Sequence, residues 1–301
     1  MESKSKGIIL ILLSALFFAL MAATVKSLEN IPVAEKIFFR NILGFFIALF
    51  IVIKKKKPLL GNNIKFLILR SSFGLLGVAC YFYALSIIPL ADAVILNKMS
   101  PFFVLILSAL FLSEKIKKLQ IVSLILAIVG ALLVIKPEFN ASLLPSIIAL
   151  FSAFFAGAAY TTIRHLRHTD EAETIVLYFT FISTISMIPF LAFDFLPGEF
   201  VIPNTSEALG LLGLGVFATT AQFLMTNAYK YAPAGELSIY TYTNIVFSTI
   251  VGLIVFLEIP DYLTIIGAVL IVCAGFFNYY ANRRFTRKWM FSNKQNTVLN
   301  I

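Results

Sequence analysis

The sequence has few of the residue types that carry most enzymatic chemistry. Its 301 residues include two histidines, two cysteines and one tryptophan, and it contains no Walker-type phosphate loop. His165 and His168 lie in one basic segment. Cys80 and Cys273 fall inside apolar segments, where we expect them to be buried and inert. The sequence therefore predicts no catalytic residues, no metal site, no cofactor and no use of ATP.

Charged residues are scarce as well. They make up 13% of the chain and hydrophobic residues 60%, with a mean hydropathy of +0.94. Soluble domains contain about a quarter charged and about half apolar residues, so lipid is the expected solvent of this chain. The net charge of +9 does not indicate nucleic acid, because the basic residues lie between apolar segments and not on one solvated face.

Long apolar segments fill most of the chain. A helix needs about 20 apolar residues to cross a hydrocarbon core about 30 Å thick. The first segment resembles a signal peptide, but it is too long for one, and we expect it to remain as the first helix. We predict an all-α membrane protein with ten spans, near residues 7–27, 33–53, 64–87, 91–112, 118–136, 143–163, 173–194, 208–230, 234–257 and 261–281.

Basic residues predict how these spans are oriented. Lys54 to Lys57 and most other Lys and Arg residues fall in connections on one side of the predicted bundle. The connections after residues 193 and 257 carry acidic residues only. Because Lys and Arg accumulate in cytoplasmic loops, both termini are predicted to be cytoplasmic. We expect a multi-pass protein of the bacterial inner membrane.

The two halves of the chain resemble each other. Residues 84–92 (ALSIIPLAD) align without gaps with residues 228–236 (AYKYAPAGE), and the same register places Glu114 on Glu258. Five spans per half is an odd number, so the second half must insert with the opposite orientation. We predict two inverted five-helix repeats around a central cavity, with boundaries at residues 1–139 and 140–284, followed by a basic cytoplasmic tail at 285–301.

Several short motifs occur in a fixed order along the first half, and the second half repeats them more loosely. They are EKIFFR at residues 35–40, Arg70, YALSIIP at residues 83–89, Pro101 and LSE at residues 112–114. In this order the chain resembles the EamA-type branch of the drug/metabolite transporter superfamily over nearly its whole length. The second half is looser, with Ile245 in place of the proline and Tyr178 where an Arg would stand. The resemblance implies ten helices, a cavity lined mainly by spans 1, 3, 4, 6, 8 and 9, and transport of metabolites, but no particular substrate.

Lys98 is the most informative single residue for a binding site. It lies near the middle of the fourth span, where a Lys costs about 2.5–3.5 kcal/mol on insertion scales, so it should face a partner or water. Pro101 cannot donate to the carbonyl of Asn97, which leaves that acceptor free beside the ammonium. We favour a cavity-facing lysine. The alternative is a structural lysine that pairs with a carboxylate such as Glu35.

Polar and aromatic residues in other spans extend this candidate site. Cavity walls are mostly apolar and aromatic with a few orienting polar groups, although interhelical hydrogen bonds explain single polar residues equally well. Arg40 either attracts anionic solutes in an outer vestibule or has a structural role, paired with Glu35 or bonded to helix-end carbonyls; we favour the structural role slightly. Asp92 is expected to cap its helix, with a protonatable coupling site as the alternative. The candidate substrate-binding residues are Lys98, Asn97, Tyr242, Thr241, Tyr240, Tyr81, Gln222, Tyr160 and Arg40.

These observations favour a secondary transporter that works by alternating access. The excess of buried cations over carboxylates within the spans favours an amino acid-like, zwitterionic or anionic small solute. The expected partners are that substrate, the lipid bilayer and a coupling proton or ion. A channel or a non-transporting scaffold is the alternative, and a membrane enzyme is the least favoured.

Overall fold

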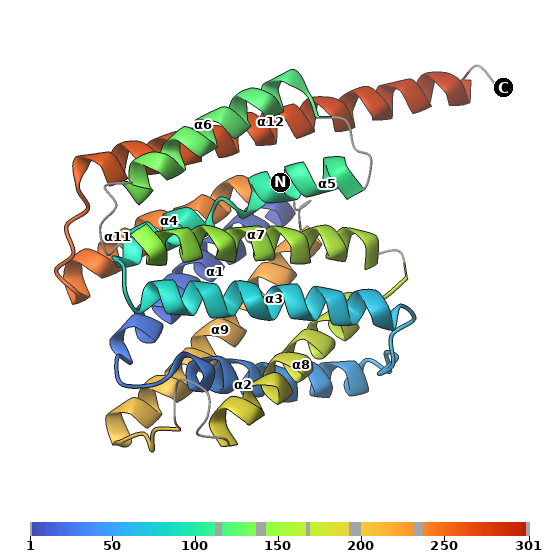
Figure 1. Ribbon diagram of the computed structural model, residues 1–301. Coiled ribbons are helices and arrows are strands. Elements are labelled where there is room, and N and C mark those ends of the chain that lie inside the picture. Colours follow the sequence, from blue (N-terminus) through green and yellow to red (C-terminus); the bar gives the residue numbers. More distant parts are fainter. Residues whose placement is uncertain are drawn as a thin grey trace.

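The computed structural model describes residues 2–111, 116–136, 143–166, 169–192, 200–231 and 237–298. Over these residues the protein is all-helical and has no strand. Its helices are packed alongside one another, and the last helix extends beyond the bundle (Figure 1). Nine helical segments within the described ranges are long and apolar enough to cross a membrane, and a shorter apolar helix covers residues 239–255.

The helices lie at the predicted spans, and most bounds agree to within a few residues; the last helix, however, continues to Val298, well beyond the predicted end near residue 281. The fourth span consists of two helices separated at Lys98 and Met99, and the ninth begins with a 3₁₀ segment. The helices are α1 (Glu2–Ser27), α2 (Val33–Lys54), α3 (Ile64–Leu85), α4 (Leu90–Asn97), α5 (Ser100–Phe111), α6 (Lys118–Ile135), α7 (Leu143–Leu166), α8 (Ala172–Ala192), α9 (Thr205–Tyr231), η1 (Ser238–Tyr242), α11 (Thr243–Val255) and α12 (Tyr262–Val298).

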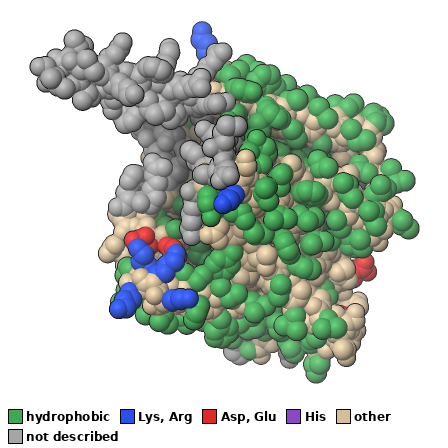
Figure 2. Space-filling model, turned by 180° about the vertical axis from the view of Figure 1, so that it is seen from behind, with side chains coloured by type: hydrophobic (Ala, Val, Ile, Leu, Met, Phe, Trp, Pro, Cys, Tyr) green, Lys and Arg blue, Asp and Glu red, His purple; other side chains and the backbone are tan. Residues whose placement is uncertain are grey.

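Successive spans run in opposite directions, so the connections gather at two ends of the bundle. We call the end that contains residues 54–63 and 169–171 the basic end, and the end that contains residues 86–89 and 256–261 the opposite end. Hydrophobic side chains cover most of one face, and the Lys and Arg side chains seen there lie towards one end (Figure 2). At the basic end, Lys55 pairs with Glu173, and Lys57 pairs with Glu171 at 2.7 Å.

Each helix in the first half packs against a helix of the second half. The closest pairs are α1 with α9, α2 with α8, α3 with α7 and α6 with α12. The α6–α12 pair approaches most tightly at Gly130 and Gly267, where a Cβ on Gly267 would lie 2.6 Å from the carbonyl oxygen of Gly130. Glycine permits this approach because it has no side chain, and van der Waals contact between close backbones stabilises helix pairs in lipid.

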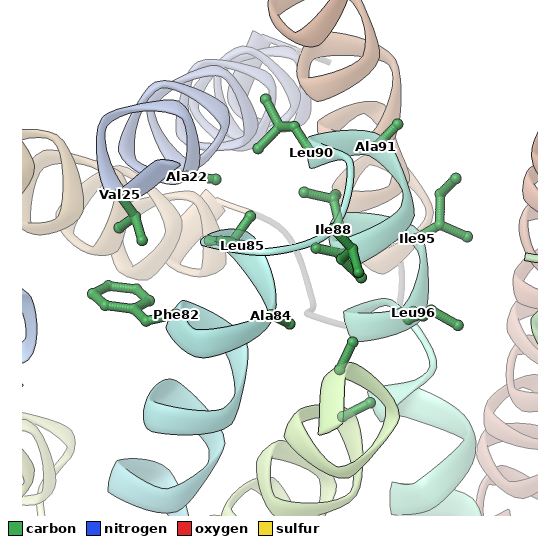
Figure 3. Packing of buried hydrophobic residues seen from close by; sticks show 14 of the residues in the cluster. Ala22, Val25, Phe82, Ala84, Leu85, Ile88, Leu90, Ala91, Ile95 and Leu96 are labelled. Carbon is green, nitrogen blue, oxygen red and sulfur yellow. The ribbon is translucent and has the colours of Figure 1, made fainter. Parts of the chain in front are cut away.

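The largest apolar core lies where the ends of α1, α3 and α4 meet (Figure 3). Phe82, Leu85, Leu90 and Leu96 are fully buried there. Outside the core, many large apolar side chains are exposed, as expected for a surface that faces lipid. Cys273 belongs to this outer surface, contrary to the prediction that it would be buried, whereas Cys80 is half-buried.

Candidate substrate site

A cavity lies between α2, α3, α8 and α9. Its volume is about 100 Å³, and its walls include Arg40, Arg70, Phe179, Thr219 and Gln222. It extends from the middle of the spans to Ile51 and Glu173 near the basic end. None of the described residues that line it lies at the opposite end. We call it the arginine cavity.

Arg40 and Arg70 approach the same aromatic ring in this cavity. Their guanidinium carbons lie 5.8 Å and 4.1 Å from the ring centroid of Phe179, within the range of cation–π contact. Arg70 is only 9% exposed. Its Nε and Nη1 atoms and the Nε atom of Arg40 are buried without a hydrogen-bond partner in the described part of the chain. Among the described residues, Arg40 donates one hydrogen bond, from Nη1 to Asn41 Oδ1 at 3.1 Å.

A glycine one turn along α3 makes room for this arrangement. Residues four apart share a helix face, so Gly74 lies beside Arg70. A Cβ at Gly74 would lie 2.8 Å from the Phe179 ring and 3.2 Å from Arg70 Nη1. Any side chain at this position would therefore displace the ring, the guanidinium or both.

Two of the predicted site residues, Arg40 and Gln222, line the arginine cavity. Tyr160, on α7, is not one of its lining residues and is 48% exposed. Its role in binding stays a prediction. The cavity therefore brings together residues from α2, α3, α8 and α9.

The pairing of Arg40 with Glu35, one of the two structural roles considered for Arg40, is wrong. Residues five apart point about 140° away from each other around a helix, so the two side chains leave α2 in different directions. Glu35 Oε2 accepts a hydrogen bond from the backbone N–H of Val201 at 3.3 Å. Lys36, one turn from Arg40, donates to Ser86 Oγ at 3.3 Å and lies away from the cavity lining.

Lys98 and Asn97 lie at the break between α4 and α5. The backbone N–H of Lys98 donates to the carbonyl oxygens of Val94 and Ile95, each at 3.1 Å, and α4 ends there. Asn97 Nδ2 donates to Ser152 Oγ on α7 at 3.0 Å. The half-buried Lys98 side chain has no ion pair among the described residues, Glu35 included, and it does not line the arginine cavity. Its role in binding stays a prediction.

The remaining candidates lie apart from the arginine cavity. Tyr242 is 7% exposed and fits against α12, where a Cβ at Gly275 would lie 2.5 Å from its ring. Tyr240 packs against Ile11 and Leu237. Thr241, the next residue along the chain, is half-buried. Tyr81 is also half-buried, with its ring centroid 6.4 Å from that of Phe82.

A charged junction joins the two halves at the opposite end. Lys26 Nζ lies 2.6 Å from Glu258 Oε1 and donates to the carbonyl oxygen of Ile88 at 2.7 Å. Glu258 Oε2 accepts from the backbone N–H of Leu90 at 2.8 Å, so it caps the first turn of α4. We call these four residues the Lys26–Glu258 junction. Glu114, its counterpart in the sequence repeat, lies outside the described residues.

Asp92 does not cap its own helix as predicted. Its carboxylate instead accepts from Thr264 Oγ1 on α12 at 3.0 Å and lies 4.0 Å from Lys136 Nζ. Lys136 also pairs with Asp261 at 2.5 Å. These groups line a second cavity, of about 230 Å³, at the opposite end. Asp92 therefore contacts the fifth and tenth spans instead of its own backbone.

Sequence reasoning missed Arg70 and Phe179 as site residues. Arg70 lies six residues inside α3, and the cost of a charge within a span, applied above to Lys98, also applies to it. That signal could have identified Arg70. Nothing in the sequence distinguishes Phe179 among the 31 phenylalanines of the chain.

The fold and the site define a multi-pass membrane protein with a mostly apolar cavity between spans that contains two arginines. Residues 5–136 and residues 143–280 each match the sequence model of the EamA-like transporter family. The chain therefore belongs to this family, within the drug/metabolite transporter superfamily, as the resemblance predicted.

Relatives with assigned transport functions match most of the chain. The pseudopaline exporter CntI of Pseudomonas aeruginosa is 36% identical over 271 residues, covering 89% of this chain and 94% of its own. The S-adenosylmethionine uptake transporter of Rickettsia bellii is 29% identical and covers 83% of this chain and 84% of its own. A crystal structure with 16% identity shares the fold, with a TM-score of 0.65 over 93% of this chain and 99% of the other. The Pseudomonas and Rickettsia relatives are named as transporters.

Proposed function

We propose that this protein is a secondary carrier that moves a small metabolite across the bacterial inner membrane by alternating access. The arginine cavity is the observation that carries this proposal. It reaches the basic end, whereas none of its described lining residues lies at the opposite end, and Ile37, Phe82 and Leu211 of α2, α3 and α9 belong to the buried apolar core. A site accessible from one side only is what one state of a carrier requires, and a channel would need a continuous path.

The arrangement of the two halves supports the same mechanism. Both halves match the same family, and their packing partners correspond: α1 packs against α9 and α11 as α7 packs against α3 and α5. We therefore propose inverted repeats at residues 1–139 and 140–284, with both termini and the tail at 285–301 in the cytoplasm. Two similar halves of opposite orientation can exchange conformations, which would expose the site to one side and then to the other.

The substrate proposed here is a small anionic or zwitterionic metabolite. Arg40 and Arg70 are the cations of the cavity, and the one described carboxylate in its lining, that of Glu173, is paired with Lys55. The relatives export or take up different compounds, so their substrates are not transferred to this chain. A coupling proton or ion is part of the proposal, with Asp92 as the candidate to bind it.

Counterflow in proteoliposomes tests the proposal. A metabolite library is first screened for compounds that raise the melting temperature of the purified protein, and a compound that does so is then used in radiolabelled form. A carrier shows saturable uptake that is accelerated by unlabelled compound on the opposite side of the membrane. Uptake that rises linearly with concentration and ignores the opposite side would indicate a channel. No uptake of any stabilising compound would favour a scaffold.

A further inference from the structure

Arg70 is a buried cation and Arg40 a half-buried one, and neither has a described counter-charge. No described carboxylate lies within ion-pair distance of either guanidinium. Their contacts are the face of Phe179, the ring of Phe82, which lies 5.9 Å from Arg40, and the Asn41 side chain. Three of their N–H positions are buried with no acceptor in the described structure.

This arrangement is unfavourable unless something else completes it. Burying a charge without a partner carries a large desolvation cost, and two like charges beside one ring repel each other. The face of an aromatic ring offsets only part of that cost. The cavity beside the guanidiniums provides space for a partner, and a negative group that accepts hydrogen bonds would offset both the charge and the unpaired N–H groups.

We propose that Arg40 and Arg70 together bind the oxyanion group, a carboxylate or a phosphate, of the transported solute. The inference rests on the proposed function and specifies its substrate class. Guanidinium groups donate paired hydrogen bonds that match the geometry of both oxyanions, which a point charge such as Lys does not reproduce. Gln222 and Thr219, which also line the cavity, are placed to contact the rest of the solute.

The cavity limits the size of the solute. Its volume of about 100 Å³ is below the roughly 300–1,000 Å³ of pockets for drug-sized ligands. A small solute fits inside, or the oxyanion group enters while the remainder extends towards Ile51 and Glu173 at the basic end. A solute whose only charge is positive has no partner at Arg40 and Arg70.

Binding measurements on the full-length protein in lipid nanodiscs test the inference without any flux. The probes are glutarate, benzoate and inorganic phosphate, with glutaramide and benzamide as neutral counterparts of the two carboxylates. At least one of the three oxyanions should bind, and a carboxylate that binds should do so when its amide does not. Comparing the affinities of glutarate, benzoate and phosphate separates a carboxylate site from a phosphate site. Binding should be at least tenfold weaker in Arg40→Gln and in Arg70→Gln, because each change removes a charge-assisted contact.

Lys65→Gln is the matched control. It removes one positive charge from the exposed first turn of α3 and leaves the arginine cavity intact, so oxyanion affinity should not change. Phenylglyoxal, which modifies arginines, provides a test on the unmodified sequence in case the Arg variants fail to fold. The bound oxyanion should protect Arg40 and Arg70 from modification, as read by peptide mass spectrometry.

The inference is overturned if none of the three oxyanions binds, if the amides bind equally well, if Lys65→Gln weakens binding as much as the Arg variants do, or if neither arginine is protected. These results are separable from those of the flux assay. Arginine-dependent oxyanion binding without counterflow would support the site and reject the carrier. Counterflow of a solute that needs neither arginine would support the carrier and reject the site.

Discussion

Replacing Glu258 with Gln should weaken the Lys26–Glu258 junction with little change in side-chain shape. A Gln carbonyl can still accept from the N–H of Leu90, so the main loss is the charge that pairs with Lys26 at 2.6 Å. The side chains of Lys26 and Glu258 are 14% and 24% exposed, so water partly screens the pair. Hydrogen bonds to charged groups contribute about 1.5–3 kcal/mol, and partial exposure favours the lower part of that range.

If the junction forms only when the opposite end is closed, its loss shifts the conformational equilibrium towards opening at that end. A change of about 1.5–2 kcal/mol corresponds to roughly a 10- to 30-fold change in the population ratio of the two states. The assay uses a single cysteine at Ala91, which is 5% exposed and lines the opposite-end cavity, in a Cys80→Ala, Cys273→Ala background. The rate of modification by a membrane-impermeant thiol reagent should rise by that factor in Glu258→Gln.

Glu207→Gln is the control for this experiment. Glu207 lies near the same end, and its Oε2 accepts from the backbone N–H of Asn204 at 2.9 Å, outside the junction. Its replacement should leave the modification rate unchanged. The reasoning fails if Glu258→Gln is modified no faster than the parent, or if Glu207→Gln is modified equally fast.

Three further predictions follow from individual contacts. Lys98→Ala should abolish transport in proteoliposomes while the purified protein keeps its elution volume and melting temperature; normal uptake would remove Lys98 from the site. Gly275→Ala should lower the melting temperature because its Cβ would lie 2.5 Å from Tyr242; overpacking costs about 1–3 kcal/mol, and Gly213→Ala, with its nearest contact at 3.8 Å, should be neutral. The pKa of Asp261 lies below its usual value. Slight burial raises this pKa, but the hydrogen bonds from Lys136 and Thr264 together lower it by more than burial raises it. The Asp261 contribution to stability should therefore be present at neutral pH and disappear as the pH falls through its lowered pKa, and equal melting-temperature differences between the parent and Asp261→Asn at pH 7 and pH 3 would contradict this.

The sequence by itself determined the solvent, the family and the positions of the helices. These are local properties, because the length of an apolar run decides whether a segment can cross the bilayer. The break beside Lys98 was also predictable, since Pro101 removes a backbone donor from the fourth span whatever surrounds it.

Only the tertiary structure decided which charges meet. The sequence placed Arg40 beside Glu35, but the turn of the helix separates them, and packing between spans brings Arg70 to the same ring as Arg40. Glu258 likewise caps α4, a helix 168 residues away in sequence. Such contacts depend on which helix faces pack together, and in lipid those faces carry no distinctive apolar pattern, because both the interior and the outer surface are apolar.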